Sequence, residues 1–514
     1  MPRLSKLVGP LLLGATLAVA PSAPASSRML GSNLGPTPQI VQTELGSVPV
    51  ETGPEPPLVA TPAPDCGPGS RPAPGIDGRV VGGPQSADGY TCNTALVGHE
   101  GTAGGYKVER YVDAQGHVCA YYDTTLIFAA NAFSATLDGK PTGTAVLDMS
   151  DPAHPVRTDT LITPAMQSPH ESLLLNQKRG LLAAVMGTPT TAPGVLDIYD
   201  VKQDCRHPVL DSSTPMGLLG HESGWSPDGN TFYATNLVHG TITAVDVSNP
   251  QLPVIVWVGE YPSHGLTLSD DGKRAYVAAR GVGLIILDTS QIQNRTPNPQ
   301  VTEIARMTWN SRTIPQVAIP IRVDGHPYLV EVDEFSFSDN PADNPPVYGQ
   351  KASSNGPIVG AARIIDIADE SHPRVVSNLR LAVDQPENRA AVANDPGANS
   401  SLQGYAAHYC GVPRENDPGI VACSFIASGL RVFDIRDPLH PRELAYFVAP
   451  PGTTAGSGNP ESAKSDWAMS KPTFDLAHDQ VWYSDGNSGF YAVKLTNAPW
   501  VSDYAGPSAN PADS

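Results

Sequence analysis

Short apolar segments recur along the chain, and each ends in an aspartate before a turn that contains proline or His-Pro. The copies are Ala145-Val146-Leu147-Asp148, Asp197-Ile198-Tyr199-Asp200, Thr243-Ala244-Val245-Asp246, Ile285-Ile286-Leu287-Asp288, Arg363-Ile364-Ile365-Asp366, Arg431-Val432-Phe433-Asp434 and a degenerate Tyr491-Ala492-Val493-Lys494. Their last residues are separated by 52, 46, 42, 78, 68 and 60 positions. A period in the forties, with the surplus in loops, is typical of one four-stranded propeller blade per repeat. The pattern therefore predicts an all-β fold, a single seven-bladed β-propeller.

The turns between these segments favour the same fold. Ser226-Pro227-Asp228-Gly229-Asn230 and Ser269-Asp270-Asp271-Gly272-Lys273 are hairpin turns, and each precedes a strand that carries Tyr233 or Tyr276. A sandwich or jelly roll also has short strands, but it does not repeat a whole strand-turn-strand unit. Because ring closure removes sheet edges, we expect residues 105–125 to donate a closing strand to the last blade.

The N-terminal region differs from the repeats. Residues 1–25 combine the basic Arg3 and Lys6, an apolar run and small residues, which predicts a signal peptide cleaved after Ala25. The next segment, 26–85, is rich in Pro, Ser and Gly and is expected to be an arm or linker. The propeller is predicted over 86–500 and a flexible tail over 501–514. No later stretch is apolar for long enough to suggest a transmembrane segment, so the chain is expected to be secreted or associated with the cell envelope.

Composition and charge narrow the range of partners. The chain has 514 residues with 48 Gly, 52 Pro, 16% charged residues and a net charge of -19. An acidic surface repels phosphate backbones, so nucleic acid is excluded as a partner. The candidate partners that remain are an envelope protein, a glycan or a small molecule.

Six cysteines agree with export, because an even number in an exported chain permits disulfides. Six cysteines allow 15 pairings. Proximity favours Cys410 with Cys423 across a hairpin and Cys92 with Cys119, which leaves Cys66 for Cys205. No CxxC spacing occurs, which disfavours a cysteine metal site.

One repeat resembles a known family. Leu284-Ile285-Ile286-Leu287-Asp288 is similar to the strand after which the bacterial LVIVD-repeat proteins are named, and the Ser-Pro-Asp-Gly turns resemble those of YVTN-like propellers. The resemblance extends over most of residues 90–499. It implies a secreted or cell-surface seven-bladed propeller without an assigned activity.

Aligning the repeats reveals a chemical pattern. His221 and His264 each lie 12 residues before a strand tyrosine, and His170 and Gln316 have the same offset from Leu182 and Tyr328. With one or two residues of slippage, His408 and Met469 occupy the same place in later repeats. This position is expected at the start of the innermost strand, where equivalent residues of all blades meet around the axis.

A ring of imidazoles suits copper, zinc or iron, and a thioether favours copper. The set His170, His221, His264, His408, Met469 and Gln316 therefore predicts one transition-metal ion, with copper or iron favoured over zinc. Glu171 and Glu222, each adjacent to a ring histidine, are expected to orient the imidazoles by accepting their second N–H.

Histidines that recur by repeat are also explained as structural residues that hydrogen-bond neighbouring blades. His154, His207, His372 and His440, each followed by proline, recur in turns between outer strands, where no metal is expected. Two functions thus stay open. One is an exported binding or scaffold module that uses the long segments 289–362 and 367–428. The alternative is a metal-dependent oxidoreductase, for which no catalytic residue is assigned.

Overall fold

The computed structural model describes residues 50–52, 55–76, 88–125, 142–186, 194–216, 220–237, 239–309, 313–337, 346–347, 350–351, 358–392, 404–451 and 466–497. All of them belong to one compact unit, Pro38–Ser514. The predicted signal peptide, the predicted tail and much of the predicted arm lie outside these residues.

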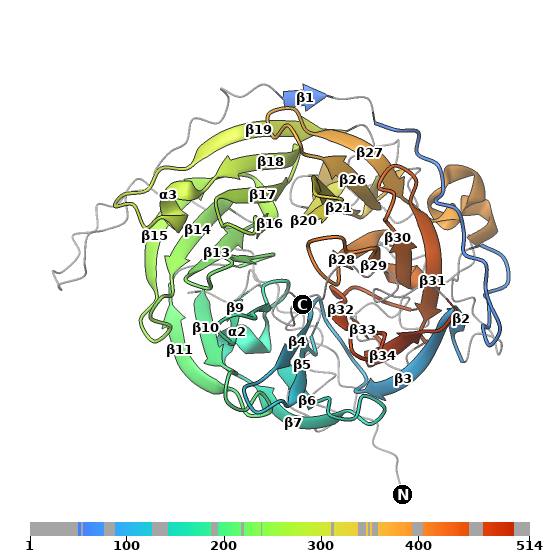
Figure 1. The fold of residues 1–514 in the computed structure, drawn as a ribbon, viewed down its shortest axis with the longest axis horizontal. Coiled ribbons are helices and arrows are strands. Elements are labelled where there is room, and N and C mark those ends of the chain that lie inside the picture. Colours follow the sequence, from blue (N-terminus) through green and yellow to red (C-terminus); the bar gives the residue numbers. More distant parts are fainter. Residues whose placement is uncertain are drawn as a thin grey trace, which may run out of the picture. The chain divides into compact units, whose positions relative to one another are not determined.

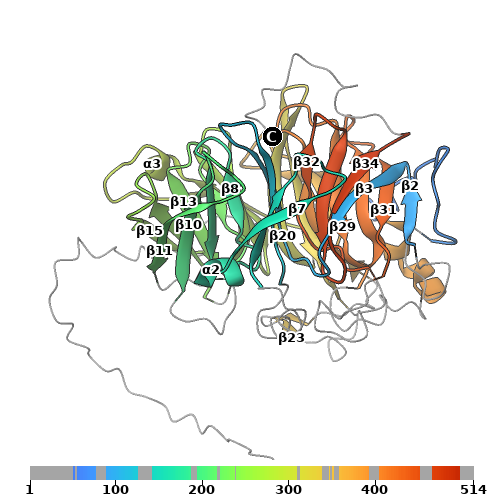
Figure 2. The same cartoon turned by 90° about the horizontal axis from the view of Figure 1, so that it is seen from below.

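Seven four-stranded antiparallel sheets are arranged around a common axis, which confirms the predicted seven-bladed β-propeller (Figures 1 and 2). From the innermost strand outward, blade 1 is β4 (Val108–Val112), β5 (Val118–Asp123), β6 (Thr144–Asp148) and β7 (Val156–Leu161); blade 2 is β8 (Leu174–Asn176), β9 (Leu181–Val185), β10 (Val195–Asp200) and β11 (Val209–Pro215); blade 3 is β12 (Gly224–Trp225), β13 (Thr231–Asn236), β14 (Thr241–Asp246) and β15 (Val254–Glu260). Blade 4 is β16 (Ser263–Leu268), β17 (Arg274–Ala279), β18 (Gly283–Asp288) and β19 (Thr302–Thr308); blade 5 is β20 (Ile314–Val323), β21 (His326–Glu334), β26 (Ala362–Asp366) and β27 (Arg374–Leu379). Blade 6 is β28 (Ala407–Gly411), β29 (Ile420–Phe425), β30 (Gly429–Asp434) and β31 (Arg442–Val448); blade 7 is β32 (Thr473–Asp475), β33 (Gln480–Asp485), β34 (Gly489–Leu495) and β3 (Thr94–Glu100).

Other elements are short. β1 (Val50–Thr52) and β2 (Tyr90–Cys92) add a fifth strand to blades 4 and 6, and two small sheets pair β22 (Ser336–Phe337) with β25 (Ile358–Val359) and β23 (Pro346–Val347) with β24 (Gln350–Lys351). The helices of the described residues are α2 (Pro164–Gln167), α3 (Ser290–Gln293), η3 (Ala382–Asp384), η4 (Pro386–Val392) and η5 (Ile426–Ser428). Within the described residues, no helix has the length and apolar character needed to cross a lipid bilayer.

The repeated motif marks the third strand of every blade, with Lys494 in place of Asp in blade 7. Six of these strands end in an aspartate whose carboxylate accepts a hydrogen bond from the backbone N–H two residues later: Asp148, Asp200, Asp246, Asp288, Asp366 and Asp434. Such Asx turns reverse the chain toward the outer strand. The third and fourth strands of each blade are paired through a bulge, which increases the twist of the sheet.

The closing strand is not the predicted one. Residues 105–125 contain β4 and β5, the two inner strands of blade 1, whereas β3 pairs with β34 as the outermost strand of blade 7. The chain therefore forms the rim of blade 7 before it crosses to the axis to begin blade 1. The exposure of β3 on one side and its bulge before Gly98 weaken the alternating pattern by which a strand is recognised.

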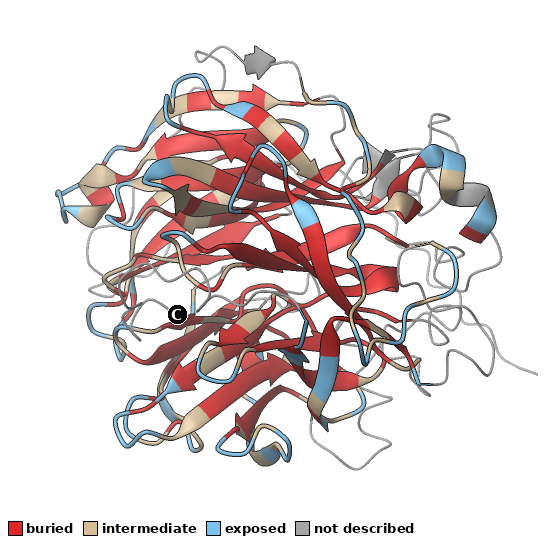
Figure 3. Ribbon diagram, turned by 45° about the vertical axis from the view of Figure 1, so that its right-hand side comes forward, coloured by how far each residue is buried: buried red, intermediate tan, exposed pale blue. Residues whose placement is uncertain are grey.

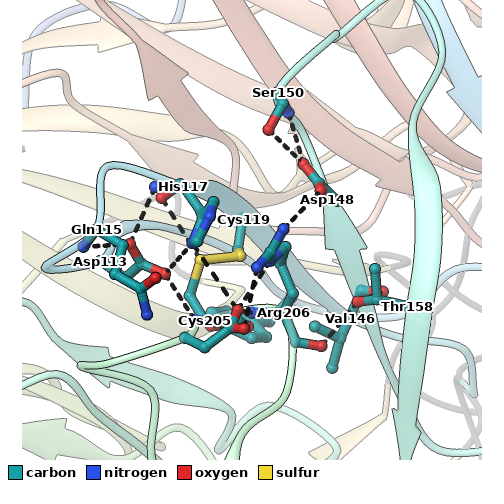
Figure 4. Close-up of a disulfide and its surroundings, with 12 residues drawn as sticks. Asp113, Gln115, His117, Cys119, Val146, Asp148, Ser150, Thr158, Cys205 and Arg206 are labelled. Carbon is teal, nitrogen blue, oxygen red and sulfur yellow. Dashed lines mark hydrogen bonds and ion pairs between the residues drawn. A yellow bond between two sulfur atoms is a disulfide. The ribbon is translucent and has the colours of Figure 1, made fainter.

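All six cysteines form disulfides. The predicted Cys410–Cys423 pair is confirmed, because these residues lie opposite each other on β28 and β29. The other two predicted pairs are wrong. Cys92 lies on the rim of blade 6 and binds Cys66 of the arm, while Cys119 of blade 1 binds Cys205 in the turn after β10 of blade 2 (Figure 4).

The core lies between the blades. The second and third strands are buried almost throughout, whereas most outer strands contain both buried and exposed positions (Figure 3). One cluster joins Tyr233 and Trp257 of blade 3 to Leu266, Val277 and Ile285 of blade 4. Burial of such apolar faces contributes about 25 cal/mol per Å², so each blade depends on its neighbours for stability.

Candidate functional site

Local bulges set the positions of the predicted axial residues. In the innermost strands of blades 4, 5 and 6 the pairing register skips one residue, and that residue is His264, Gln316 or His408. A bulged residue leaves the ladder, and its side chain is re-aimed. His170 and His221 lie just before the first strands of blades 2 and 3, and His170 adopts a left-handed backbone with φ of 50°. Backbone strain of this kind is concentrated at functional sites.

The structure brings the four predicted histidines together. The Nε2 atoms of His221 and His264 are 2.6 Å apart, and their rings are stacked with centroids separated by 4.5 Å. The ring of His170 lies 4.7 Å from that of His221. His221, His264 and His408 are buried, whereas the His170 side chain is 16% exposed and gives the cluster its most accessible edge.

Glu171 lies among all four imidazoles. Its Oε2 is 3.0 Å from His221 Nε2 and 3.8 Å from His264 Nε2, and its Oε1 is 3.3 Å from His408 Nε2 and 3.9 Å from His170 Nε2. The carboxylate therefore faces the Nε2 atoms of all four histidines.

A second carboxylate, which the sequence analysis missed, joins the cluster. Glu334 is the last residue of β21, and its Oε1 is 3.6 Å from His264 Nε2 while its Oε2 is 3.3 Å from His408 Nε2. It comes from a second strand of a blade, so the repeat position that reveals the histidines could not reveal it.

Main-chain carbonyls fix two of the imidazoles from behind. His264 Nδ1 is 2.6 Å from the carbonyl oxygen of Pro315, and His408 Nδ1 is 2.9 Å from that of Met469. Because a carbonyl oxygen only accepts, each Nδ1 carries the hydrogen. In the neutral ring the Nε2 lone pair then points at the carboxylates, which is the arrangement of metal-ligating histidines.

Burial and the two carboxylates control the protonation of the cluster. Burial, reinforced by His221, lowers the pKa of His264 well below its usual value. Burial alone would also lower the pKa of His408, but its contacts with Glu171 and Glu334 outweigh this and raise the pKa to about 9. Burial opposes ionisation of Glu171, yet the imidazoles around it hold its pKa well below the ordinary range. A positive charge between the carboxylates is therefore favoured at this point on the axis.

The other predicted residues lie close by but have different contacts. Gln316 Nε2 donates to the hydroxyl of Tyr409 at 2.8 Å, and among the described residues its buried Oε1 has no hydrogen-bond partner. Met469 packs in an apolar cluster with Trp467 and meets the site through its carbonyl. Glu222 accepts from Lys107 and, at 2.6 Å, from Tyr409, so it does not orient an imidazole.

Lys107, Glu222 and Tyr409 form a second polar group beside the histidines. Lys107 is completely buried, contacts the Glu222 carboxylate and lies 4.0 Å above the centre of the Tyr409 ring. Burial lowers the pKa of Lys107 and raises that of Glu222. The Tyr409 ring meets the His408 ring edge-on at 4.7 Å, which connects this buried ion pair to the cluster.

Blade 1 contributes an aromatic ring in place of a histidine. The ring of Tyr106 lies 4.4 Å from that of His170 and 5.3 Å from that of His408. Asp123, at the end of β5, holds this segment by accepting hydrogen bonds from the backbone N–H groups of Tyr106 and Lys107. Tyr106 therefore packs against one side of the cluster.

The turn histidines lie where the sequence predicts. His154, His372 and His440 each contact the carboxylate three residues earlier, at 2.8, 3.1 and 3.0 Å, and their side chains are 81%, 67% and 81% exposed. The backbone N–H of His207 donates to the carbonyl of Asp204 in the equivalent turn. These residues stabilise turns at the rim, as expected.

Asp113, His117 and Asp204 form a third polar group, near the Cys119–Cys205 disulfide (Figure 4). These residue types could bind a metal, but their side chains already take part in hydrogen bonds and ion pairs. The Asp113 carboxylate accepts hydrogen bonds from the backbone N–H groups of Gln115, His117 and Cys205 and contacts His117 Nδ1 at 2.8 Å. Asp204 is engaged by the Arg206 guanidinium. The group is explained by the hydrogen bonds that fix the disulfide loop.

A seven-bladed β-propeller with a polar cluster on its axis is the class that these observations define. Residues 268–293, from the end of β16 to the end of α3, match the family model described as the LVIVD repeat, so the resemblance noted in the sequence is confirmed. None of the curated proteins matches the chain.

The solved structures that this chain resembles are distant. Hydrazine synthase of Kuenenia stuttgartiensis is 14% identical over 61% of this chain and 72% of its own, with a TM-score of 0.37. A putative 6-phosphogluconolactonase of Bacteroides uniformis is 12% identical over 66% and 85%, with a TM-score of 0.43. U3-55K is 8% identical over 80% and 100%, with a TM-score of 0.47. Likenesses at this level assign no activity.

Proposed function

We propose that this protein is an exported propeller whose axial cluster binds a transition metal. The observation that carries the proposal is the opposed arrangement at His264 and His408, where Nδ1 donates to a main-chain carbonyl and Nε2 faces the carboxylates of Glu171 and Glu334. Burying two carboxylates is costly unless a cation accompanies them. A metal ion supplies that cation and uses the imidazole lone pairs.

The donor set favours iron over copper. The thioether of Met469 lies in an apolar cluster, and the carboxylates of Glu171 and Glu334 lie beside the imidazoles. Imidazole and carboxylate donors together suit non-haem iron, whereas thioethers and thiolates select copper(I). Iron bound here would supply Lewis-acid and one-electron chemistry, which supports a metal-dependent oxidoreductase acting on a small molecule that enters beside His170.

Three disulfides support export, because such bonds persist in oxidising compartments. Binding of an envelope partner by the loops remains compatible with a metal centre on the axis. In that case the metal would stabilise a scaffold, and turnover of a small molecule would be absent.

Elemental analysis of the protein purified from its exported location tests the proposal. We would compare the wild type with His221→Ala/His264→Ala and with His372→Ala/His440→Ala, a control in which the two histidines are exposed. Near-stoichiometric iron in the wild type and the control, lost from the axial variant, is the expected result. A wild type that holds no transition metal after such purification overturns the proposal. Circular dichroism of all three proteins ensures that matched folds are compared.

A further inference from the structure

The eight donor atoms of the axial cluster divide into two groups of four. Glu171 directs Oε2 toward His221 and His264 and Oε1 toward His170 and His408, while Glu334 directs Oε1 toward His264 and Oε2 toward His408. The first group is His221 Nε2, His264 Nε2, Glu171 Oε2 and Glu334 Oε1, and the second is His170 Nε2, His408 Nε2, Glu171 Oε1 and Glu334 Oε2.

We infer that the cluster is a two-metal site in which Glu171 and Glu334 bridge two first-row transition-metal ions. The inference rests on the proposed function and goes beyond it in the number of ions and in the role of the carboxylates. A single ion of this kind accepts about six donors at most, as in the octahedral sites of such metals. Eight converging donors exceed that number, whereas two ions with four protein donors each retain open positions.

The distances fit this division. Two donors bound at about 2.0–2.2 Å to one ion, at angles between tetrahedral and octahedral, lie roughly 3–3.5 Å apart. His221 Nε2 to Glu171 Oε2, at 3.0 Å, and His408 Nε2 to each carboxylate, at 3.3 Å, already lie in that range. The remaining carboxylate distances of 3.6–3.9 Å and the 2.6 Å between His221 and His264 require shifts of a few tenths of an ångström.

Bridging carboxylates hold two ions about 3.5–4 Å apart, the spacing at which two metals act together on one oxygen ligand. Two divalent ions bring four positive charges, and the two glutamates neutralise only half of them. The open positions are therefore suited to an anionic third bridge, either hydroxide or an oxyanion group of the substrate. His170 belongs to the second group and is the most accessible of the four histidines. The third bridge is therefore expected to enter on the side of His170.

Manganese(II) loading of the chelated full-length wild type tests the inference. The expected result is two equivalents bound per chain and an electron paramagnetic resonance spectrum broadened by exchange coupling between the ions. Glu334→Gln, which removes one bridge, is expected to bind less than two equivalents and to lose the coupling. Glu370→Gln, which alters a surface carboxylate paired with Arg274, is the control and should behave as the wild type.

The outcomes separate this inference from the proposed function. One equivalent per chain with an uncoupled spectrum in the wild type overturns the two-metal site and leaves a single-ion centre. No bound manganese, together with no metal in the protein as purified, overturns both. Because the wild-type stoichiometry decides the question by itself, an unfolded Glu334→Gln variant would not rescue the inference.

Discussion

Histidine recurs by repeat in two regions of the propeller, at the axis and in the rim turns, and the two sets differ in the origin of their carboxylates. Each turn histidine meets an aspartate three residues earlier, in the same exposed turn. The axial histidines meet Glu171 and Glu334, which come from blades 2 and 5, and His408 of blade 6 contacts both. Recurrence alone therefore assigns no role to a histidine. A carboxylate in the same turn indicates a histidine that stabilises the turn, whereas carboxylates from several blades indicate a candidate functional site.

The largest expected effect contrasts two cations that lie beside carboxylates. Lys107→Met leaves Glu222 as an uncompensated buried charge and should lower the free energy of unfolding by about 3–5 kcal/mol. Arg442→Met removes a 57% exposed partner of Asp434 and should cost less than about 1 kcal/mol. Urea titrations followed by tryptophan fluorescence measure both. Equal costs would mean that the axial pair is as well solvated as the rim pair.

Metal removal should produce the next largest effect. At a free metal concentration 100 times the dissociation constant, binding stabilises the folded state by about 2.7 kcal/mol, and a chelator removes that contribution. Scanning calorimetry with and without chelator should show this loss for the wild type and for His372→Ala/His440→Ala, but not for His221→Ala/His264→Ala. A chelator response retained by the axial variant would place the metal elsewhere.

A smaller effect is expected from the turn aspartates. Asp434→Ala removes the acceptor of the Arg436 backbone N–H and the partner of two arginines, which should cost about 1 kcal/mol. Asp246→Ala removes only the hydrogen bond to the Ser248 backbone and should cost less. Thermal unfolding of the two variants ranks them. The reverse order would show that the arginines contribute nothing to the turn.

The smallest effect belongs to the turn histidines themselves. His440→Ala alters an 81% exposed side chain that contacts Asp437, so the free energy of unfolding should change by no more than about 0.5 kcal/mol. The same urea titration detects the change. A loss above about 1 kcal/mol would give these histidines a structural weight that their exposure does not explain.

Local signals account for what could be predicted from the sequence. The repeated strand and turn depend on neighbouring residues only, so all seven third strands were found, six of them with a terminal Asp and its Asx turn. His264 and His408 were found because they occupy one bulge that recurs in the inner strands. These patterns fix the fold class and the ring of histidines.

The remaining features depend on contacts between blades, which a single repeat does not encode. Glu334 and Lys107 reach the axis from positions outside the histidine register. The two wrong disulfide pairs and the misplaced closing strand have a common cause, since both follow from how the chain passes from the rim of blade 7 to the axis of blade 1. That route is set by the closed ring and not by any local pattern.

The pairing of β3 with β34 has a consequence for the order of folding. Thr94 lies opposite Leu495, so the strand made early in synthesis must wait for nearly the whole chain before it finds its partner. Closing so long a loop is entropically costly, and contacts between residues so distant in sequence slow folding. The axial cluster is shared by blades 2 to 6 within the ring that this pairing closes. Uptake of the proposed metal is therefore expected to follow chain completion, as a late step of maturation.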